Sequence, residues 1–163
     1  MNEQSIHHYL SSCTLPEWES IPDFGLYMDQ LLTYETRCFP EIGAYLDLTS
    51  TMVNNYVKTG LIDKPAGKKY SRDSIAQLLM VCLLKQTTPV ESMKKLLHPS
   101  DGSCTRERYE QFRATQERII SAFSAIRDAS PLSYALESAS CHLISRLLLA
   151  ETPVGPEDTR KKK

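Results

Sequence analysis

Amide and basic side chains at helical spacing give residues 49–72 the clearest chemistry in this chain. Asn54, Asn55 and Lys58 lie on one side of a short helical pattern whose other side is apolar. Asparagine pairs with adenine through two hydrogen bonds, and lysine reaches guanine or phosphate oxygens. Two consecutive asparagines are poor helix formers, so their place within a helix needs a reason. Contact with the base edges of double-stranded DNA supplies one, and the alternative is a solvated helix face without a ligand.

Four basic residues follow closely, at Lys64, Lys68, Lys69 and Arg72. A proline and a glycine lie among them, so the backbone is expected to reverse and to carry the lysines on a turn. Lysines on a turn beside a groove-reading helix bind phosphate, which positions a protein on DNA without reading its sequence. The predicted DNA-binding set combines hydroxyl, amide, phenol and basic groups: Thr49, Ser50, Thr51, Asn54, Asn55, Lys58, Lys64, Lys68, Lys69, Tyr70 and Arg72.

Local signals predict the elements that position these groups. Capping hydroxyls and a terminal glycine predict a helix over residues 50–58. A hairpin over 61–70 and a helix over 71–86 are expected to follow, since the latter carries a long apolar stripe. Upstream, residues 40–46 predict the first helix of a helix-turn-helix, and a further helix is expected within 21–39.

The motifs on these elements resemble those of a known superfamily. GLI, KKYS and RDSIAQLLMVCLLK, in that order, resemble the DNA-binding domain of the mercury-resistance regulators (MerR). LTSTMVNNYVK, with LYMDQL upstream, is more similar still to an uncharacterised bacterial family known only as a domain of unknown function. The resemblance covers about residues 20–100 and implies a mainly α fold, a MerR-like winged helix-turn-helix with one small β-hairpin wing. Asn55 and Tyr56 stand where MerR proteins usually carry arginine and tyrosine.

The last third of the chain predicts a C-terminal helical pair, over residues 105–127 and 130–150. In the first of these helices, side chains at spacings of three and four form a short heptad seam. The seam residues are Tyr109, Phe112, Gln116, Ile119, Phe123 and Ile126. We expect a homodimer here, because a buried Gln116 can pair with its own copy across a two-fold axis. Two-fold DNA sites also require two DNA-binding heads.

The chain of 163 residues suits one small domain with extensions. We expect a flexible lead-in over residues 1–20, the winged helix-turn-helix domain over 21–100, a dimerising helical extension over 105–150 and a disordered basic tail over 151–163. The net charge of −1 conceals an asymmetry. The first 36 residues hold six acids and no base, whereas residues 54–95 hold eight bases against three acids, which favours polyanion binding by the central region.

Composition argues against several other classes of protein. No apolar run approaches the roughly 20 residues of a membrane span, and the N-terminus lacks a signal-peptide pattern, so a cytoplasmic protein is expected. Five scattered cysteines show no zinc-ligand spacing, and no metal or cofactor is expected. No nucleophile–base constellation and no glycine-rich phosphate loop is evident, which argues against an enzyme.

The leading function predicted from the sequence is that of a DNA-binding transcriptional regulator, and two other functions remain compatible with it. A protein-interaction or adaptor module on the winged scaffold would explain the acidic N-terminal third and the nearly neutral net charge. A sensor of an unknown small-molecule effector would use the space between the last two helices, where Tyr109, Phe112, Phe123 and Tyr134 are candidate lining residues. Steep weakening by salt distinguishes phosphate-driven DNA binding from the adaptor function.

Overall fold

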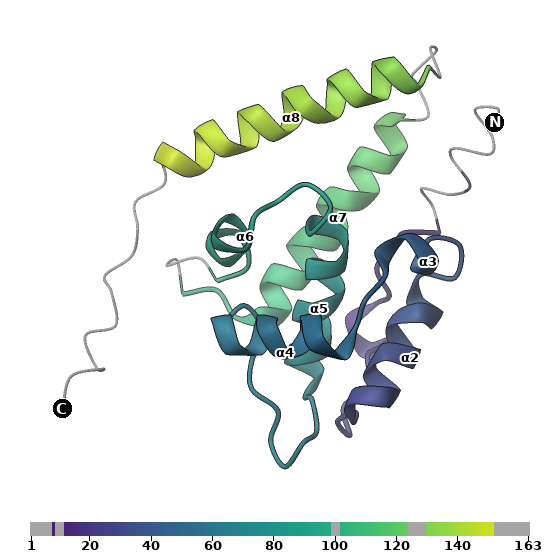
Figure 1. The fold of residues 1–163 in the computed structure, drawn as a ribbon, viewed down its shortest axis with the longest axis vertical. Coiled ribbons are helices and arrows are strands. Elements are labelled where there is room, and N and C mark those ends of the chain that lie inside the picture. Colours follow the sequence, from purple (N-terminus) through teal and green to yellow (C-terminus); the bar gives the residue numbers. More distant parts are fainter. Residues whose placement is uncertain (1–7, 9–11, 99–101, 124–129, 152–163) are drawn as a thin grey trace.

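The computed structural model describes residues 8, 12–98, 102–123 and 130–151, and every regular element in this part of the chain is helical (Figure 1). The elements are η1 (Trp18–Ser20), α2 (Met28–Cys38), α3 (Gly43–Leu46), α4 (Ser50–Thr59), α5 (Arg72–Leu84), α6 (Val90–Leu97), α7 (Thr105–Phe123) and α8 (Pro131–Glu151). The expectation of a mainly α fold is therefore confirmed.

The centre of the fold is α5, which runs between α4, α6 and α7 (Figure 1). Ser71 begins the helix, because its hydroxyl accepts a hydrogen bond from the Ser74 backbone N–H at 3.3 Å. Residues 74–82 are all buried. A helix that is apolar on nearly every side must be covered on every side, and α5 packs against both α6 and α7.

The segment before α2 belongs to the core. Leu15, Trp18 and Ile21 are buried, and the Trp18 ring meets the edge of Tyr109 on α7 at a centroid distance of 5.7 Å. The Tyr109 hydroxyl donates to the Pro16 carbonyl at 2.9 Å. The expectation of a flexible lead-in over residues 1–20 is therefore wrong for 12–20, because its apolar side chains fill a gap beside α7. Residues 1–7 and 9–11 lie outside the described residues.

Of the two helices before α4, one lies within the range that the sequence predicts and the other is shorter than predicted. The helix expected within residues 21–39 begins at Met28, because Leu26 is extended and pairs with Tyr70 through two backbone hydrogen bonds. The helix expected over 40–46 is a single turn over Gly43–Leu46 that follows a non-helical turn. α2 packs against both α3 and α4 and so supports the segment that precedes the candidate site.

The expected β-hairpin wing over 61–70 contains no strand among the described residues. Ala66 and Lys69 form one isolated antiparallel bridge, with both backbone hydrogen bonds at 3.0 Å. A ladder does not extend from this bridge, because Pro65 lacks a backbone N–H and Tyr70 pairs with Leu26 rather than with the first half of the loop. The segment is a tight turn on a long loop, and the prediction of a hairpin is corrected.

The expected dimer seam on α7 is used within the chain. Tyr109 is fully buried, and Gln116 binds the backbone of the N-terminal segment, accepting from the Leu15 N–H at 3.1 Å and donating to the Cys13 carbonyl at 2.7 Å. The argument that Gln116 needs a second copy to pair with is therefore wrong. Of the remaining seam residues, Phe112 is half-buried and Ile119 is exposed. The side chain of Phe123 and all of residue 126 lie outside the described residues, as does the tail over 152–163.

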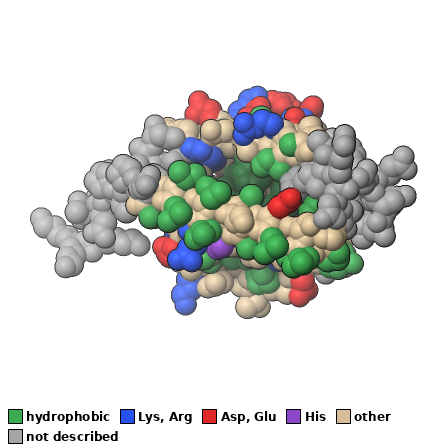
Figure 2. Space-filling view, turned by 90° about the horizontal axis from the view of Figure 1, so that it is seen from above, with side chains coloured by type: hydrophobic (Ala, Val, Ile, Leu, Met, Phe, Trp, Pro, Cys, Tyr) green, Lys and Arg blue, Asp and Glu red, His purple; other side chains and the backbone are tan. Residues whose placement is uncertain are grey.

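The final helix, α8, packs against α6 rather than forming a close pair with α7 (Figure 1). Its half-buried residues include Tyr134, His142 and Leu149, whereas six large aliphatic side chains are more than half exposed. These are Leu132, Leu136, Leu143, Ile144, Leu147 and Leu148. Figure 2, which views this side of the molecule, shows apolar side chains along much of the surface. In the described part of the chain, no helix combines the length and apolar character needed to cross a membrane.

Candidate nucleic-acid interface

The helix α4 presents a polar face outward and an apolar face inward. Thr49 caps it, because the threonine side chain accepts a hydrogen bond from the Met52 N–H at 3.3 Å. Val53 and Tyr56 are buried in the core. Gly60 ends the helix in the left-handed conformation at φ 76°, and the next N–H reaches back to the Tyr56 carbonyl at 2.9 Å. Both ends of α4 are thus fixed by local chemistry.

The outward face of α4 carries four residues that share one side of the helix. Thr51, Asn54, Asn55 and Lys58 are all exposed, and positions spaced by three, four and seven residues are neighbours on a helix surface. Thr49 and Ser50 are exposed at the N-terminal end of the same helix. The predicted groove-reading residues therefore form one continuous polar surface, as the sequence pattern indicated.

The basic loop, defined here as residues 63–69, is held at its first end by α5. Gln77 is buried, and its side-chain amide binds Asp63 twice. Its oxygen accepts from the Asp63 backbone N–H at 2.8 Å, and its nitrogen donates to the Asp63 carboxylate at 2.9 Å. Ser74 adds a hydroxyl that donates to the Asp63 carbonyl at 3.4 Å. A buried amide that is paired on both of its polar atoms fixes the direction in which the loop leaves the core.

The other end of the basic loop is fixed by the segment before α2. The Leu26 N–H donates to the Tyr70 carbonyl at 3.0 Å, and the Tyr70 N–H donates back at 2.8 Å. Gly25, at φ 71°, allows this approach, because a Cβ there would lie 3.2 Å from the Lys69 Cβ. The loop therefore projects from a base that is anchored on both sides, next to α4 (Figure 1).

The tip of the loop is a two-residue turn. Gly67 and Lys68 have φ angles of 56° and 68°, between the paired residues Ala66 and Lys69. Positive φ at both central positions is the pattern of a type I′ turn. Lysine is an uncommon residue in this conformation, so its position at the outermost point of the loop costs some backbone energy. The turn points Lys68 and its neighbours away from the core, and Lys64, Lys68 and Lys69 are all exposed.

Two predicted DNA-binding residues have internal roles. The Tyr70 side chain is only 3 % exposed and belongs to the core. Arg72 donates through Nε to the Ile21 carbonyl at 2.9 Å, lies over the Trp18 ring and approaches the Asp23 carboxylate at 3.6 Å. Both residues therefore join the loop and α5 to the N-terminal segment. The Tyr70 ring faces the core, and a DNA contact of the half-buried Arg72 stays a prediction.

Sequence reasoning missed an aromatic group beside the loop. Lys69 Nζ lies 5.2 Å from the centre of the Tyr27 ring, and both Tyr27 and Phe24 are exposed. The signal that identifies Tyr27 is the backbone pairing of Leu26 with Tyr70, which brings residues 24–27 against the basic loop. That pairing joins positions far apart in the sequence, so local patterns do not show it.

The electrostatics of this surface are set by four exposed lysines. Among the described residues, no carboxylate lies within 4.0 Å of the ammonium groups of Lys58, Lys64, Lys68 and Lys69. The one acid within the loop, Asp63, is hydrogen-bonded by Gln77 at the base. The positive charges therefore gather on α4 and the loop tip, which suits a polyanion.

The helix α2 carries a buried carboxyl group. Glu35 is buried, and its Oε1 has no hydrogen-bond partner among the described residues. Burial raises the pKa of Glu35, although Cys82 and Lys85 oppose the shift. Burial also raises the pKa of the Cys82 thiol and of the Tyr56 hydroxyl. These groups do not line the outward face of the candidate interface.

Comparison with known families places this surface within a recognised sequence domain. Residues 16–118 match the model of a domain of unknown function, DUF1836. The chain belongs to the DUF1836 family. The match runs from η1 through most of α7, so it includes α4, the basic loop and the segments that anchor it, and α8 lies beyond its end. Neither the curated proteins nor the solved structures contain a match to this chain. The predicted relationship to an uncharacterised family is confirmed, and the match gives no evidence for a MerR-type domain.

Proposed function

We propose that this DUF1836 protein is a transcriptional regulator that binds double-stranded DNA through α4 and the basic loop. The observation that carries the proposal is the exposure of four lysines and two asparagines on α4 and on the loop that follows it in the chain. The lysines supply phosphate contacts, which hold the protein on the duplex, and the asparagines supply hydrogen bonds to base edges, which select sequence.

In the proposed complex α4 enters the major groove, which is wide enough to accept a helix. Thr51, Asn54, Asn55 and Lys58 then face the bases and the adjoining backbone. The loop tip, with Lys64, Lys68 and Lys69, lies along the phosphates beside that groove. α3, the turn at 47–49 and α4 would act as the helix-turn-helix in this arrangement, and the loop would act as the wing that the MerR resemblance implies.

The proposed regulator acts as a homodimer, with α8 as the contact in place of the α7 seam. Leu132, Leu136, Leu143 and Leu147 form an exposed stripe on α8. Their spacing is symmetric about the bond between residues 139 and 140, so an antiparallel second copy would place Leu136 against Leu143 and Leu132 against Leu147. Such self-complementarity is what an isologous two-fold contact requires.

The test of this function is selection of binding sites from random duplex DNA, followed by fluorescence polarisation with the selected sites. We expect the selected site to bind at least tenfold more tightly than random duplex at 150 mM salt. Changing Asn54 or Asn55 to alanine should relax base preference by about 1–3 kcal/mol per bidentate adenine contact, without unfolding α4. Equal binding of selected and random duplexes would refute the sequence-specific function.

A second candidate, a protein-interaction module without sequence-specific DNA binding, is favoured by exposed aromatic side chains. Phe24 is 71 % exposed within the acidic N-terminal segment, and Tyr45 is 80 % exposed on α3. Exposed aromatic residues are enriched in protein interfaces. Phe24→Ser with Tyr45→Ser would abolish partner capture and leave DNA affinity unchanged under this candidate, whereas the DNA-binding proposal requires the lysines and asparagines instead.

A further inference from the structure

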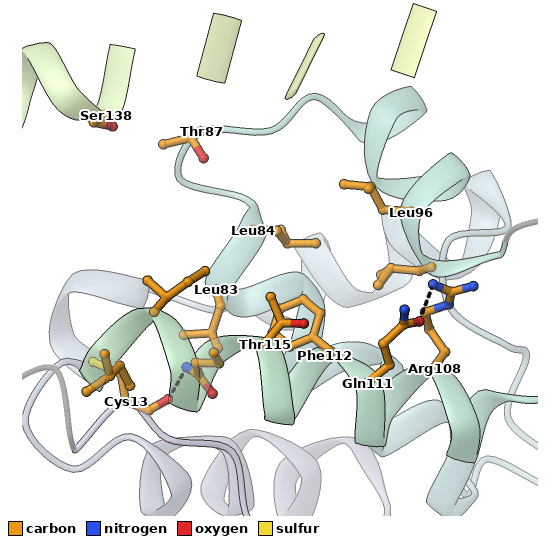
Figure 3. A pocket seen from close by; sticks show the side chains of 14 residues that line it. Cys13, Leu83, Leu84, Thr87, Leu96, Arg108, Gln111, Phe112, Thr115 and Ser138 are labelled. Carbon is orange, nitrogen blue, oxygen red and sulfur yellow. Dashed lines mark hydrogen bonds between the residues drawn. The ribbon is translucent and has the colours of Figure 1, made fainter. Parts of the chain in front are cut away.

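A cavity of about 800 Å³ lies between α5, α6, α7 and α8, on the side of the core away from the basic loop. Its walls are mainly apolar and include Leu83, Leu84, Leu96, Phe112, Ile119 and Ile120. Figure 3 shows side chains from α5, α6 and α7 that meet around this space, with Ser138 of α8 above them. Cavities of roughly 300–1,000 Å³ with this kind of lining are typical of small-molecule sites.

The cavity is not filled by the helix that covers it. α8 directs the small side chain of Ser138 toward the cavity, while its leucine stripe faces outward. The space is partly open to solvent, so its apolar lining is in contact with water, and an apolar group that entered it would remove that surface from water. The exposed position of the leucines and the apolar lining below Ser138 together indicate that an apolar occupant of another kind fits this space.

Among the described residues that line the cavity, Arg108 is the one charged side chain, and it stands at one end. Arg108 lines the wall, with its guanidinium nitrogens donating to the Gln111 Oε1 at 2.8 Å and to the Ser103 hydroxyl at 3.1 Å. Figure 3 shows Arg108 and Gln111 side by side at this end. Among the described residues, the lining contains no carboxylate. An arginine at the edge of apolar walls suits a carboxylate, because the guanidinium is always charged and its planar donors match the two carboxylate oxygens.

We propose that this cavity binds an amphipathic carboxylate, with an aliphatic chain against Leu84, Phe112 and Ile120 and a head group at Arg108. Gln111 would orient the guanidinium through the hydrogen bond that it already accepts. The proposal rests on the cavity alone, so it stands or fails independently of DNA binding.

The test is isothermal titration calorimetry of the full chain with dodecanoate, kept below its micelle-forming concentration, and with dodecanol. We expect one dodecanoate per chain, at least tenfold tighter than dodecanol, and a negative heat-capacity change from apolar burial. Arg108→Gln should weaken dodecanoate at least tenfold and leave dodecanol unchanged, whereas Arg118→Gln, outside the cavity lining, should change neither. Absence of dodecanoate binding, or equal affinity for both probes, would overturn the proposal.

A second pair of variants tests the position of the chain within the cavity. Thr115 lines the cavity and Ala114 beside it does not. Thr115→Phe should fill the space and abolish binding of both probes, whereas Ala114→Phe should bind as the unmodified protein does. Circular dichroism establishes that each variant is folded before the titration. Unchanged binding by a folded Thr115→Phe variant would refute this site. A dodecanoate affinity that falls at least tenfold as the protein dimerises would refute it as well, since a second copy would then occupy the cavity.

Discussion

The sharpest prediction concerns the three lysines of the basic loop. Their ammonium groups extend from a turn whose two ends are anchored by Gln77 and by Leu26, so their removal should not move the loop base. We choose Lys64→Gln, Lys68→Asn and Lys69→Gln in one protein. Asparagine is used at 68 because that residue has φ 68°, a conformation that asparagine tolerates better than alanine does.

The expected magnitude follows from counting phosphate contacts. Lys58 and the three loop lysines give up to four contacts for each head, and each contact contributes about 0.9 to the slope of log affinity against log salt. One head should therefore show a slope near −3.6, and the triple variant a slope near −0.9. Between 50 and 200 mM salt, the unmodified protein should weaken on the order of 100-fold and the variant only about 3-fold.

The assay is fluorescence polarisation with a labelled duplex at several salt concentrations, compared between the triple variant and Lys95→Gln. Lys95 is exposed on α6, away from the loop, and controls for a general loss of positive charge. Affinity for all duplexes should fall about equally in the triple variant, because phosphate carries no sequence information. An unchanged slope in the triple variant, or an equal change in the control after scaling for charge, would show that the loop does not lie on DNA.

Three further predictions concern polar side chains that make contacts inside the fold. Gln77→Leu should release Asp63 and weaken DNA binding severalfold with all lysines present, measured by polarisation, and unchanged affinity would show that the loop needs no anchor. The raised pKa of Glu35 means that its stabilising neutral form is fully present below the usual carboxyl pKa and is lost as pH rises through the folded value. Glu35→Gln should therefore raise the free energy of unfolding, measured in urea, by about 1 kcal/mol at pH 7.5 and leave it unchanged near pH 4. An equal difference at both pH values would contradict the buried-acid explanation. Gln116→Ala should cost about 1–3 kcal/mol through the loss of its bonds to Cys13 and Leu15, and an unaltered urea midpoint would show that the N-terminal segment packs without them.

Helix α4 shows how far local sequence signals reach. The capping threonine, the apolar spacing and Gly60 predict residues 50–58, and the helix spans Ser50–Thr59. These signals act within a few residues of each other, so a single sequence contains all of them. The same reasoning places α8 correctly, because this helix begins at Pro131.

The contacts that shape the candidate interface are of another kind. Leu26 pairs with Tyr70 through backbone hydrogen bonds. The Gln77 side chain binds both the backbone N–H and the carboxylate of Asp63. A side chain that binds a backbone group leaves no complementary residue type at the other position, so no pattern in the sequence identifies the partner. This explains why the exposed lysines can be predicted from local patterns while the internal contacts of Arg72 cannot.

Gln116 shows the same limit of sequence patterns in the prediction of oligomeric assembly. A polar residue in an apolar stripe indicates that something satisfies its amide, but both a second copy and a backbone segment meet that requirement. The structure supplies the backbone of residues 13–15, which removes the reason for a two-fold contact on α7. The stripe of leucines on α8 has no such partner among the described residues and is turned away from the core. The physical case for a homodimer therefore moves from a polar residue that needs pairing to an apolar surface that needs covering.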